Sequence, residues 1–156
     1  MRGFSRLRWE NVKMNRIIVM IKEPNKDCKF VNIENGSNDL RLYRWLKEEI
    51  GYKNIRHVFI RKLSENRNLV MLVDEDRDFN DSEFNIYIEL EMPNGIITDS
   101  IFGPIVFAIE EVIHTEYGVE REYYSLSIED GSLNGIEDVL FGSNEIKKKL
   151  TLEERE

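Results

Sequence analysis

The segment from Arg16 to Tyr52 constrains the fold more than any other part of this chain of 156 residues. It begins with the apolar, mostly β-branched run Ile17 to Ile21, which is typical of a strand covered on both faces. The residues Pro24 to Asp27 are typical of a turn, because proline fixes φ and Asn and Asp tolerate the backbone conformations of tight turns. An alternating stretch, Cys28 to Ile33, follows. The segment therefore predicts a β-hairpin, although its register stays open.

A helix of about residues 37–50 is predicted next. Asn35-Gly36 ends the hairpin, and Ser37 or Asn38 can cap the helix. Its apolar stripe consists of Leu42, Tyr43, Leu46 and Ile50, with Trp45 beside it. Gly51 fits the left-handed position that ends a helix. Because the stripe is apolar and aromatic, we expect the helix to lie on a sheet.

Patterns downstream predict further strands at Ile55–Leu63, Leu69–Val73, Phe84–Leu90, Ile96–Ile101 and Ile105–Ile109. The polar residues Glu111–Glu122 predict an irregular connection, and Tyr123–Phe141 predicts short helical turns split by glycines. The predicted fold is α+β. It has an antiparallel or mixed sheet of five to seven strands, the main helix on one face and short C-terminal helices.

The length fits a single folded domain. We expect a basic N-terminal extension at residues 1–13, an α+β domain at 14–142 and a charged C-terminal helix or tail at 143–156. The longest apolar runs are too short for a membrane span. Cys28 is the only cysteine, which favours a reducing, cytoplasmic location.

Charge is distributed unevenly along the chain. Residues 1–62 carry 15 Lys and Arg against 7 Asp and Glu, a difference of +8; residues 63–156 carry 7 against 23, a difference of −16. Two arrangements follow from this. Either the acidic half offers one negative surface to a basic partner protein, or the two halves face and neutralise each other. Direct DNA binding is disfavoured by the net charge of −8.

The predicted acidic surface centres on the stretch after Val73. Its residues are Asp74, Glu75, Asp76, Asp78, Asp81, Glu83, Glu89 and Glu91. On a strand, Glu89 and Glu91 point to one side about 7 Å apart, comparable to the phosphate spacing of a DNA strand. The same loop resembles an acidic calcium loop, but Phe79 stands where the glycine belongs, so no metal site is predicted.

A small ligand is the alternative to a protein partner. The cationic residues that would surround a phosphate are Arg41, Arg44, Arg56, Arg61 and Lys62. Such a module would bind or sequester a nucleotide or another small molecule.

No catalytic motif stands out, and no cofactor is predicted. His57 alternates with apolar residues, which indicates a packed or edge histidine, and Cys28 is expected to be a small core residue. His114 would act as a general base only beside a carboxylate. Without a glycine-rich phosphate loop or an HExxH motif, the chain is predicted not to be an enzyme; a metal-dependent enzyme is the weaker alternative.

Several segments together resemble a family of small proteins catalogued as domain of unknown function 3846. They are Val19–Pro24, Leu46–Tyr52, Leu72–Asp76, Asp99–Phe107 and Ser125–Ser127, and the likeness spans about residues 17 to 130. Two features differ. The family's Gly-Gly-Tyr is Ile50-Gly51-Tyr52 in this chain, and the usual Asn-Arg pair before the glycine-containing strand is missing.

The resemblance implies an accessory protein of a phage, plasmid or other mobile element with no assigned chemistry. Together with the charge, it leads us to expect a non-enzymatic, cytoplasmic protein that binds and inhibits a basic host protein. An anti-CRISPR or similar anti-defence inhibitor is the concrete form of this expectation. The sequence leaves the target and a possible homo-oligomer open.

Overall fold

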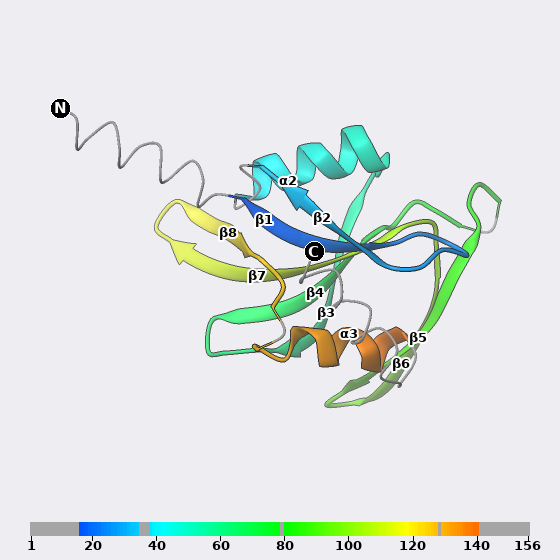
Figure 1. Cartoon of the computed structure of the whole chain (residues 1–156). Helices are drawn as coiled ribbons and strands as arrows, with labels where there is room; N and C mark the ends of the chain where they lie inside the picture. Colours follow the sequence, from blue (N-terminus) through cyan, green and yellow to red (C-terminus); the bar gives the residue numbers. More distant parts are fainter. Residues whose placement is uncertain (1–15, 35–37, 79, 128, 141–156) are drawn as a thin grey trace.

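A computed structural model describes residues 16–34, 38–78, 80–127 and 129–140. It has the predicted α+β fold, with a six-stranded main sheet, a separate two-stranded sheet and few helices (Figure 1). The elements are β1 (Ile17–Lys22), β2 (Lys29–Ile33), α2 (Asp39–Trp45), η1 (Leu46–Ile50), β3 (Ile55–Lys62), β4 (Arg67–Asp74), β5 (Phe84–Met92), β6 (Gly95–Phe102), β7 (Ile105–Thr115), β8 (Gly118–Tyr124) and α3 (Ser132–Leu140). The predicted extension at residues 1–13 and the helix or tail at 143–156 lie outside the described residues.

β7 is the central strand of the main sheet, whose order is β2-β1-β7-β4-β3. Its first residues pair with β1, and Val106–Glu111 pairs with β4 on the other side. Its second half, from Ile109, pairs with β8. All these pairings are antiparallel, which decides between the two kinds of sheet that the sequence allowed.

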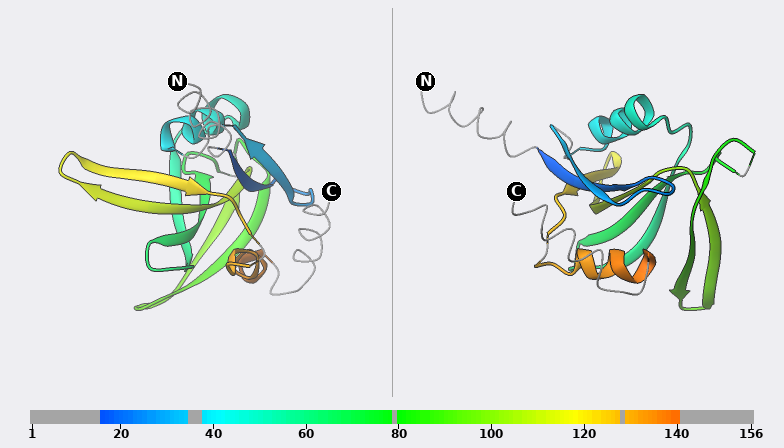
Figure 2. Two further views of the ribbon diagram at one scale, coloured as in Figure 1. Left: turned by 60° about the vertical axis from the view of Figure 1, so that its left-hand side comes forward. Right: turned by 45° about the vertical axis from the view of Figure 1, so that its right-hand side comes forward.

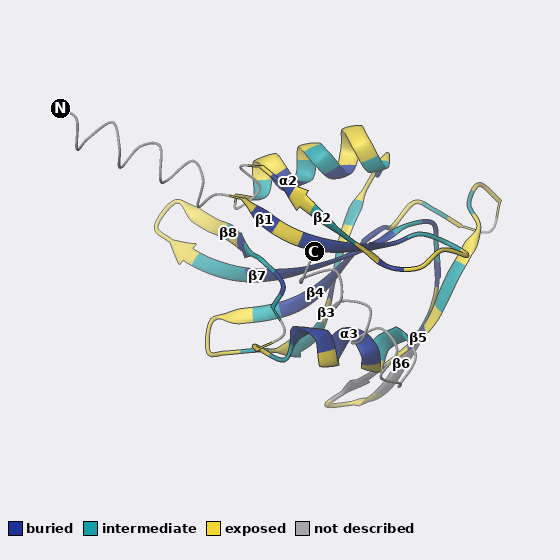
Figure 3. Cartoon of the chain, in the orientation of Figure 1, coloured by how far each residue is buried: buried dark blue, intermediate teal, exposed yellow. Residues whose placement is uncertain are grey.

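The core lies on both faces of the main sheet. Along β7, Phe107 and Ile109 face α3 and the β5–β6 sheet, whereas Val106 and Ala108 face α2. Figure 2 shows the helices on opposite sides of the sheet, and Figure 3 shows its centre buried. Burying each large apolar side chain contributes about 1.5–3 kcal/mol, so both layers stabilise the fold.

The main helix forms as predicted. The Asn38 side chain accepts a hydrogen bond from the Arg41 N–H at 2.9 Å, so Asn38 is the cap. Leu42 and Leu46 are fully buried against the sheet. The last turn widens into the π-helical segment η1, and Gly51 ends it with φ at 87°. That left-handed conformation favours glycine, as the sequence indicated.

The prediction of an irregular connection over Glu111–Glu122 is wrong. β7 continues to Thr115 and returns as β8, with Ile113 opposite Glu120 and His114 opposite Val119. A hairpin satisfies its backbone hydrogen bonds within itself and tolerates charged side chains that point into solvent. A search for apolar runs therefore overlooks it.

The prediction for Tyr123–Phe141 is wrong in part. Tyr123 and Tyr124 end β8, and one helix, α3, spans Ser132–Leu140 in place of several short turns. Gly135 does not break this helix. Its missing side chain lets the helix approach Leu69 of β4, which a Cβ at position 135 would meet at 2.5 Å.

A polar cluster ties the end of the helical layer to the sheet. The Asp74 carboxylate accepts the backbone N–H groups of Lys53 (2.9 Å) and Asn54 (3.1 Å), and Arg77 Nε donates to it at 3.2 Å. Arg77 also donates to the Gly51 carbonyl at 3.1 Å. The buried Tyr52 hydroxyl lies 2.8 Å from the carbonyl oxygens of Leu72 and Pro104 and shares its proton between them.

These bonds also determine how Asp74 titrates. Burial alone would raise the pKa of this carboxyl, but the backbone N–H groups of Lys53, Asn54 and Asp76, with the Arg77 guanidinium, outweigh it. The pKa of Asp74 is therefore below its ordinary value. Since the folded state prefers the ionised form, Asp74 contributes its full stabilisation when the pH is above the ordinary aspartate pKa of about 3.9. That stabilisation is lost as the pH falls through the lower pKa that Asp74 has in the folded protein.

We expect Asp74→Asn to lower the free energy of unfolding by about 2–3 kcal/mol at neutral pH, because an amide nitrogen would then face two donors. The difference from wild type should shrink as the pH falls below 4 or so. Urea unfolding at a series of pH values measures both effects. The neighbouring exposed Asp76, changed to Asn, is the control with the same charge change. Equal losses for the two variants would contradict a special role for Asp74.

We expect Gly135→Ala to destabilise the fold, although alanine favours helices. Overpacking the core against fully buried Leu69 costs about 2 kcal/mol and the helix propensity returns about 1 kcal/mol, a net loss of about 1 kcal/mol. Thermal unfolding measures it. Asn134→Ala, at the exposed neighbouring position of α3, should be neutral or stabilising. A stabilised Gly135→Ala protein would show that α3 can move away from β4.

Candidate ligand-binding site

The acidic residues predicted to form one surface lie in different places. Asp74 is buried and bound within the polar cluster, so it offers nothing to a partner. The exposed carboxylates between β4 and β5 are Glu75, Asp76, Asp78, Asp81 and Glu83. Glu89 is exposed on β5, whereas the side chain of Glu91 is outside the described ones. A second acidic group, on the β7–β8 hairpin, lies at the other end of the molecule (Figure 1).

Cations from the first half of the chain neutralise part of the acidic half. Arg56 pairs with Asp99 at 3.0 Å, and Arg61 pairs with Asp138. The neutralisation that the charge distribution allowed is thus present in part. The described carboxylates do not gather on one continuous surface, and the prediction of a basic host target stays a prediction.

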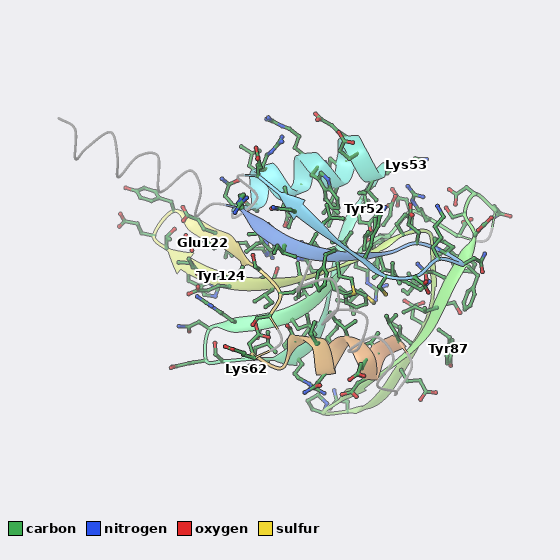
Figure 4. The ribbon with its side chains drawn as sticks, viewed as in Figure 1. Tyr52, Lys53, Lys62, Tyr87, Glu122 and Tyr124 are labelled. Atoms are coloured by element: carbon green, nitrogen blue, oxygen red, sulfur yellow. The ribbon has the colours of Figure 1, made fainter. Side chains whose placement is uncertain are left out.

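The five cations proposed for a small ligand are not brought together either. Arg41 and Arg44 are on α2, while Arg56 and Arg61 are on β3 and engaged in the ion pairs above. Lys62 lies at the far end of β3 from Lys53, as the labels in Figure 4 show. A phosphate could not contact all five.

A different set of side chains does surround a hollow, of about 350 Å³, on the α2 face of the sheet. Its lining residues are Tyr43, Lys47, Lys53, Asn54, Ile55, His57 and Arg121. They come from α2, η1, the connection into β3, β3 itself and β8. The hollow therefore exists only where the helix meets the sheet.

His57 is held from both sides at this hollow. Its Nδ1 lies 3.0 Å from Glu110 Oε2, and its Nε2 lies 2.8 Å from the Tyr43 hydroxyl. Since Glu110 is a buried carboxylate of β7, a proton on Nδ1 can be donated to it while Nε2 accepts the Tyr43 proton. His57 is thus a positioned side chain, more constrained than the packed or edge histidine predicted from sequence.

Two further side chains complete this network. Arg121 Nε lies 3.7 Å from Glu110 Oε2 and is buried without a hydrogen-bond partner. The Tyr123 hydroxyl donates to the Tyr43 oxygen at 3.5 Å. Burial first, and then its bond to Tyr43, raise the pKa of Tyr123, so it stays a neutral donor. The network has one buried negative charge, with a guanidinium and an imidazole on either side of it.

The lining of the hollow is positive. Lys47 and Lys53 are exposed, and neither forms an ion pair with a carboxylate in the described part of the chain. Glu110 lies behind the lining and offsets the charge of Arg121. Two ammonium groups outside any described ion pair, together with a guanidinium and an imidazole, suit an anion.

Asp74 positions one side of the hollow. By accepting the N–H groups of Lys53 and Asn54, its carboxylate fixes the backbone from which these side chains extend. The acidic residue predicted to bind a partner thus orients two lining residues of the hollow.

Other predicted sites lie elsewhere. His114 is exposed near the tip of the β7–β8 hairpin, and Cys28 is a buried core residue, as expected. Among the described residues, no group of three or more metal-ligating side chains is suitably placed for a metal ion. Neither described helix is long and apolar enough to be a membrane span.

The sequence reasoning overlooked most of the hollow. Neither Lys47 nor Glu110 is among the predicted site residues, and Arg121 lies in the segment predicted to be an irregular connection. The spacing of polar residues gives no signal for this site, because His57 and Glu110 are 53 residues apart and come from strands that are not neighbours.

Comparison with known proteins assigns no relationship: no family model, curated protein or solved structure matches this chain. The resemblance to domain of unknown function 3846 therefore stays a prediction.

Proposed function

We propose that the protein binds a small anionic ligand in the hollow beneath the helix. The observation that carries this proposal is the lining: three cationic side chains and a positioned histidine surround the space, with no carboxylate among the described lining residues. This is the small-molecule alternative that the sequence raised, built from other residues than those first considered.

The size of the hollow limits the ligand. Ligand pockets commonly measure about 300–1,000 Å³, and 350 Å³ is at the lower end. A phosphate or carboxylate group on a small molecule fits this volume, as does the phosphate end of a mononucleotide. The edge of the Tyr43 ring and Ile55 would provide apolar contact beside the charged groups.

The proposed activity is binding without turnover. Tyr43 engages Nε2 of His57, and Glu110 engages Nδ1, so neither ring nitrogen is free to take a proton from a substrate. His57 instead serves as a rigid part of the wall. The mobile-element origin implied by the resemblance fits a protein that sequesters a ligand.

We expect inorganic pyrophosphate and AMP to bind to the wild-type protein and to bind more weakly as salt is added. Lys53→Gln and Lys47→Gln should each weaken binding by about fivefold, because each removes an ammonium group that has no other ion-pair partner. Isothermal titration calorimetry measures the affinities. Both lysines are exposed, so the variants should unfold like the wild type.

The matched control is Lys29→Gln, an exposed lysine on β2 outside the hollow. It should bind both probes as tightly as the wild type. Equal weakening in Lys29→Gln would indicate attraction to the whole surface, and no binding of either anion to the wild type would refute the proposal.

A second candidate function is the binding of a basic host protein, as the charge distribution and the resemblance predicted. The exposed carboxylates between β4 and β5 favour it. Glu75 and Glu83 are both exposed, and each is held in place by a hydrogen bond: Glu83 accepts from Asn25 at 3.2 Å, and Glu75 accepts from Asn54 at 3.2 Å. Charge reversal of Glu75 and Asp76 should then remove salt-dependent binding of a folded, lysine-rich probe protein, which presents a basic surface and no free strand.

A further inference from the structure

The tip of the β7–β8 hairpin projects from the body of the protein. Figures 1 and 2 show it extending beyond the sheet, and Figure 3 shows it exposed. β4 pairs with β7 only as far as Glu111, so Val112–Thr115 pairs with β8 alone among the described strands. On the outer side of β8, the described residues form one bridge, Asn38 with Glu122. The edge of β8 from Gly118 to Arg121 is therefore unpaired within the described residues.

This projecting part carries apolar side chains in solvent. Tyr117 is 92% exposed and Val119 is 52% exposed. Proteins usually protect free strand edges with a covering segment, proline, a bulge or charged side chains, because such edges add further strands. Along the free edge of β8, only the charges of Glu120 and Arg121 have this role among the described residues, and they select against a like-charged strand. An uncovered edge with exposed apolar residues is typical of a surface that receives a partner strand.

The two faces of the hairpin differ in chemistry. Because side chains alternate along a strand, Glu120 and Glu122 share one face of β8, and Val119 and Arg121 share the other. Glu111 lies directly opposite Glu122, so the first face carries three carboxylates. Like charges opposite each other destabilise a strand pair.

Tyr124, labelled with Glu122 in Figure 4, relieves this repulsion only in part. Its hydroxyl lies 2.5 Å from Glu111 Oε2 and 3.1 Å from Glu122 Oε2, and one proton cannot satisfy both carboxylates fully. Its bond to Glu111, followed by burial, raises the pKa of Tyr124 to about 12, so the proton stays on the phenol. The Arg67 guanidinium lies over the Tyr124 ring, 3.5 Å from its centroid. Glu120 forms no ion pair with a lysine, arginine or histidine in the described part of the chain.

We infer that the β7–β8 hairpin docks an extended, basic segment of a partner protein, which pairs with β8 along its free edge. Lys or Arg side chains of that segment would lie on the face of Glu120 and Glu122, and apolar ones on the face of Val119. This inference does not depend on anion binding in the hollow. It also concerns a different surface from the acidic β4–β5 loop.

A second copy of this chain fits the edge less well. Two β8 strands side by side would bring together the carboxylates of both chains. A contact between β8 and the basic edge strand β3 would be head-to-tail, and such contacts extend into filaments instead of closing. Charge complementarity therefore favours a basic partner from another protein.

The test is an NMR titration of the full chain with a capped hexapeptide of alternating lysine and valine. We expect shift changes confined to residues 116–122, slower hydrogen exchange of β8 amides, and no binding of the same peptide with glutamate in place of lysine. Glu120→Lys combined with Glu122→Lys should weaken binding by about tenfold. Glu75→Lys combined with Asp76→Lys, which changes the net charge equally, should leave it unchanged.

Val119→Thr provides a second variant, since this exposed position keeps a β-branched side chain and should fold normally. This variant should bind the lysine–valine peptide more weakly, because it removes an apolar contact. Shift changes in the β4–β5 loop, equal weakening by both charge reversals, or no binding at all would overturn the inference. A dimer formed through β8 would also overturn it, because a second copy would then occupy the edge. Peptide binding that appears only after residues 1–13 are deleted would overturn it too, because those residues would then occupy the edge.

Discussion

The Asp74 carboxylate holds together three parts of the molecule that no single element connects. It accepts the backbone N–H groups that follow the helical layer, and it binds Arg77, which in turn donates to the carbonyl groups at the end of η1. The Arg77 side chain also packs against Gly103, where a Cβ would lie 2.6 Å from its Cδ. A buried charge is stabilising only when it is fully hydrogen-bonded, and this one is. The cluster thereby fixes the connection between the helix and β3, which carries Lys53 and Asn54 of the hollow.

The central strand β7 makes the second contribution. It contacts β1, β4 and β8, which come from the beginning, the middle and the end of the described chain. Because its side chains alternate between the two faces of the sheet, β7 contributes to both halves of the core. It also places one carboxylate, Glu110, on the face covered by the helix. A carboxylate buried there needs donors, and His57 provides one while Arg121 approaches from β8. The positioned histidine is thus a consequence of one polar residue in a largely apolar strand.

Charge has separate roles in different parts of the structure. Some carboxylates stabilise the fold from within, as Asp74 does, and some neutralise arginines, as Asp99 and Asp138 do. Others stay in solvent, on the β4–β5 loop and on the β7–β8 hairpin. The lysines around the hollow have the opposite sign, and Lys53 lies next to Asn54, which donates a hydrogen bond to Glu75 of the β4–β5 loop. The net charge of −8 therefore hides a cationic hollow and two acidic surfaces.

The sequence by itself determined the features that depend on neighbouring residues. The apolar run of β1, the turn at Pro24, the cap at Asn38 and the left-handed Gly51 were all readable, because each is set by chemistry within a few positions. The α+β class followed from their order. What only the tertiary structure decided is which polar residues meet: Asp74 with Lys53, His57 with Glu110, and Arg121 with Glu110. Those contacts depend on sheet order and on side-chain direction, and a linear pattern of polar residues contains neither.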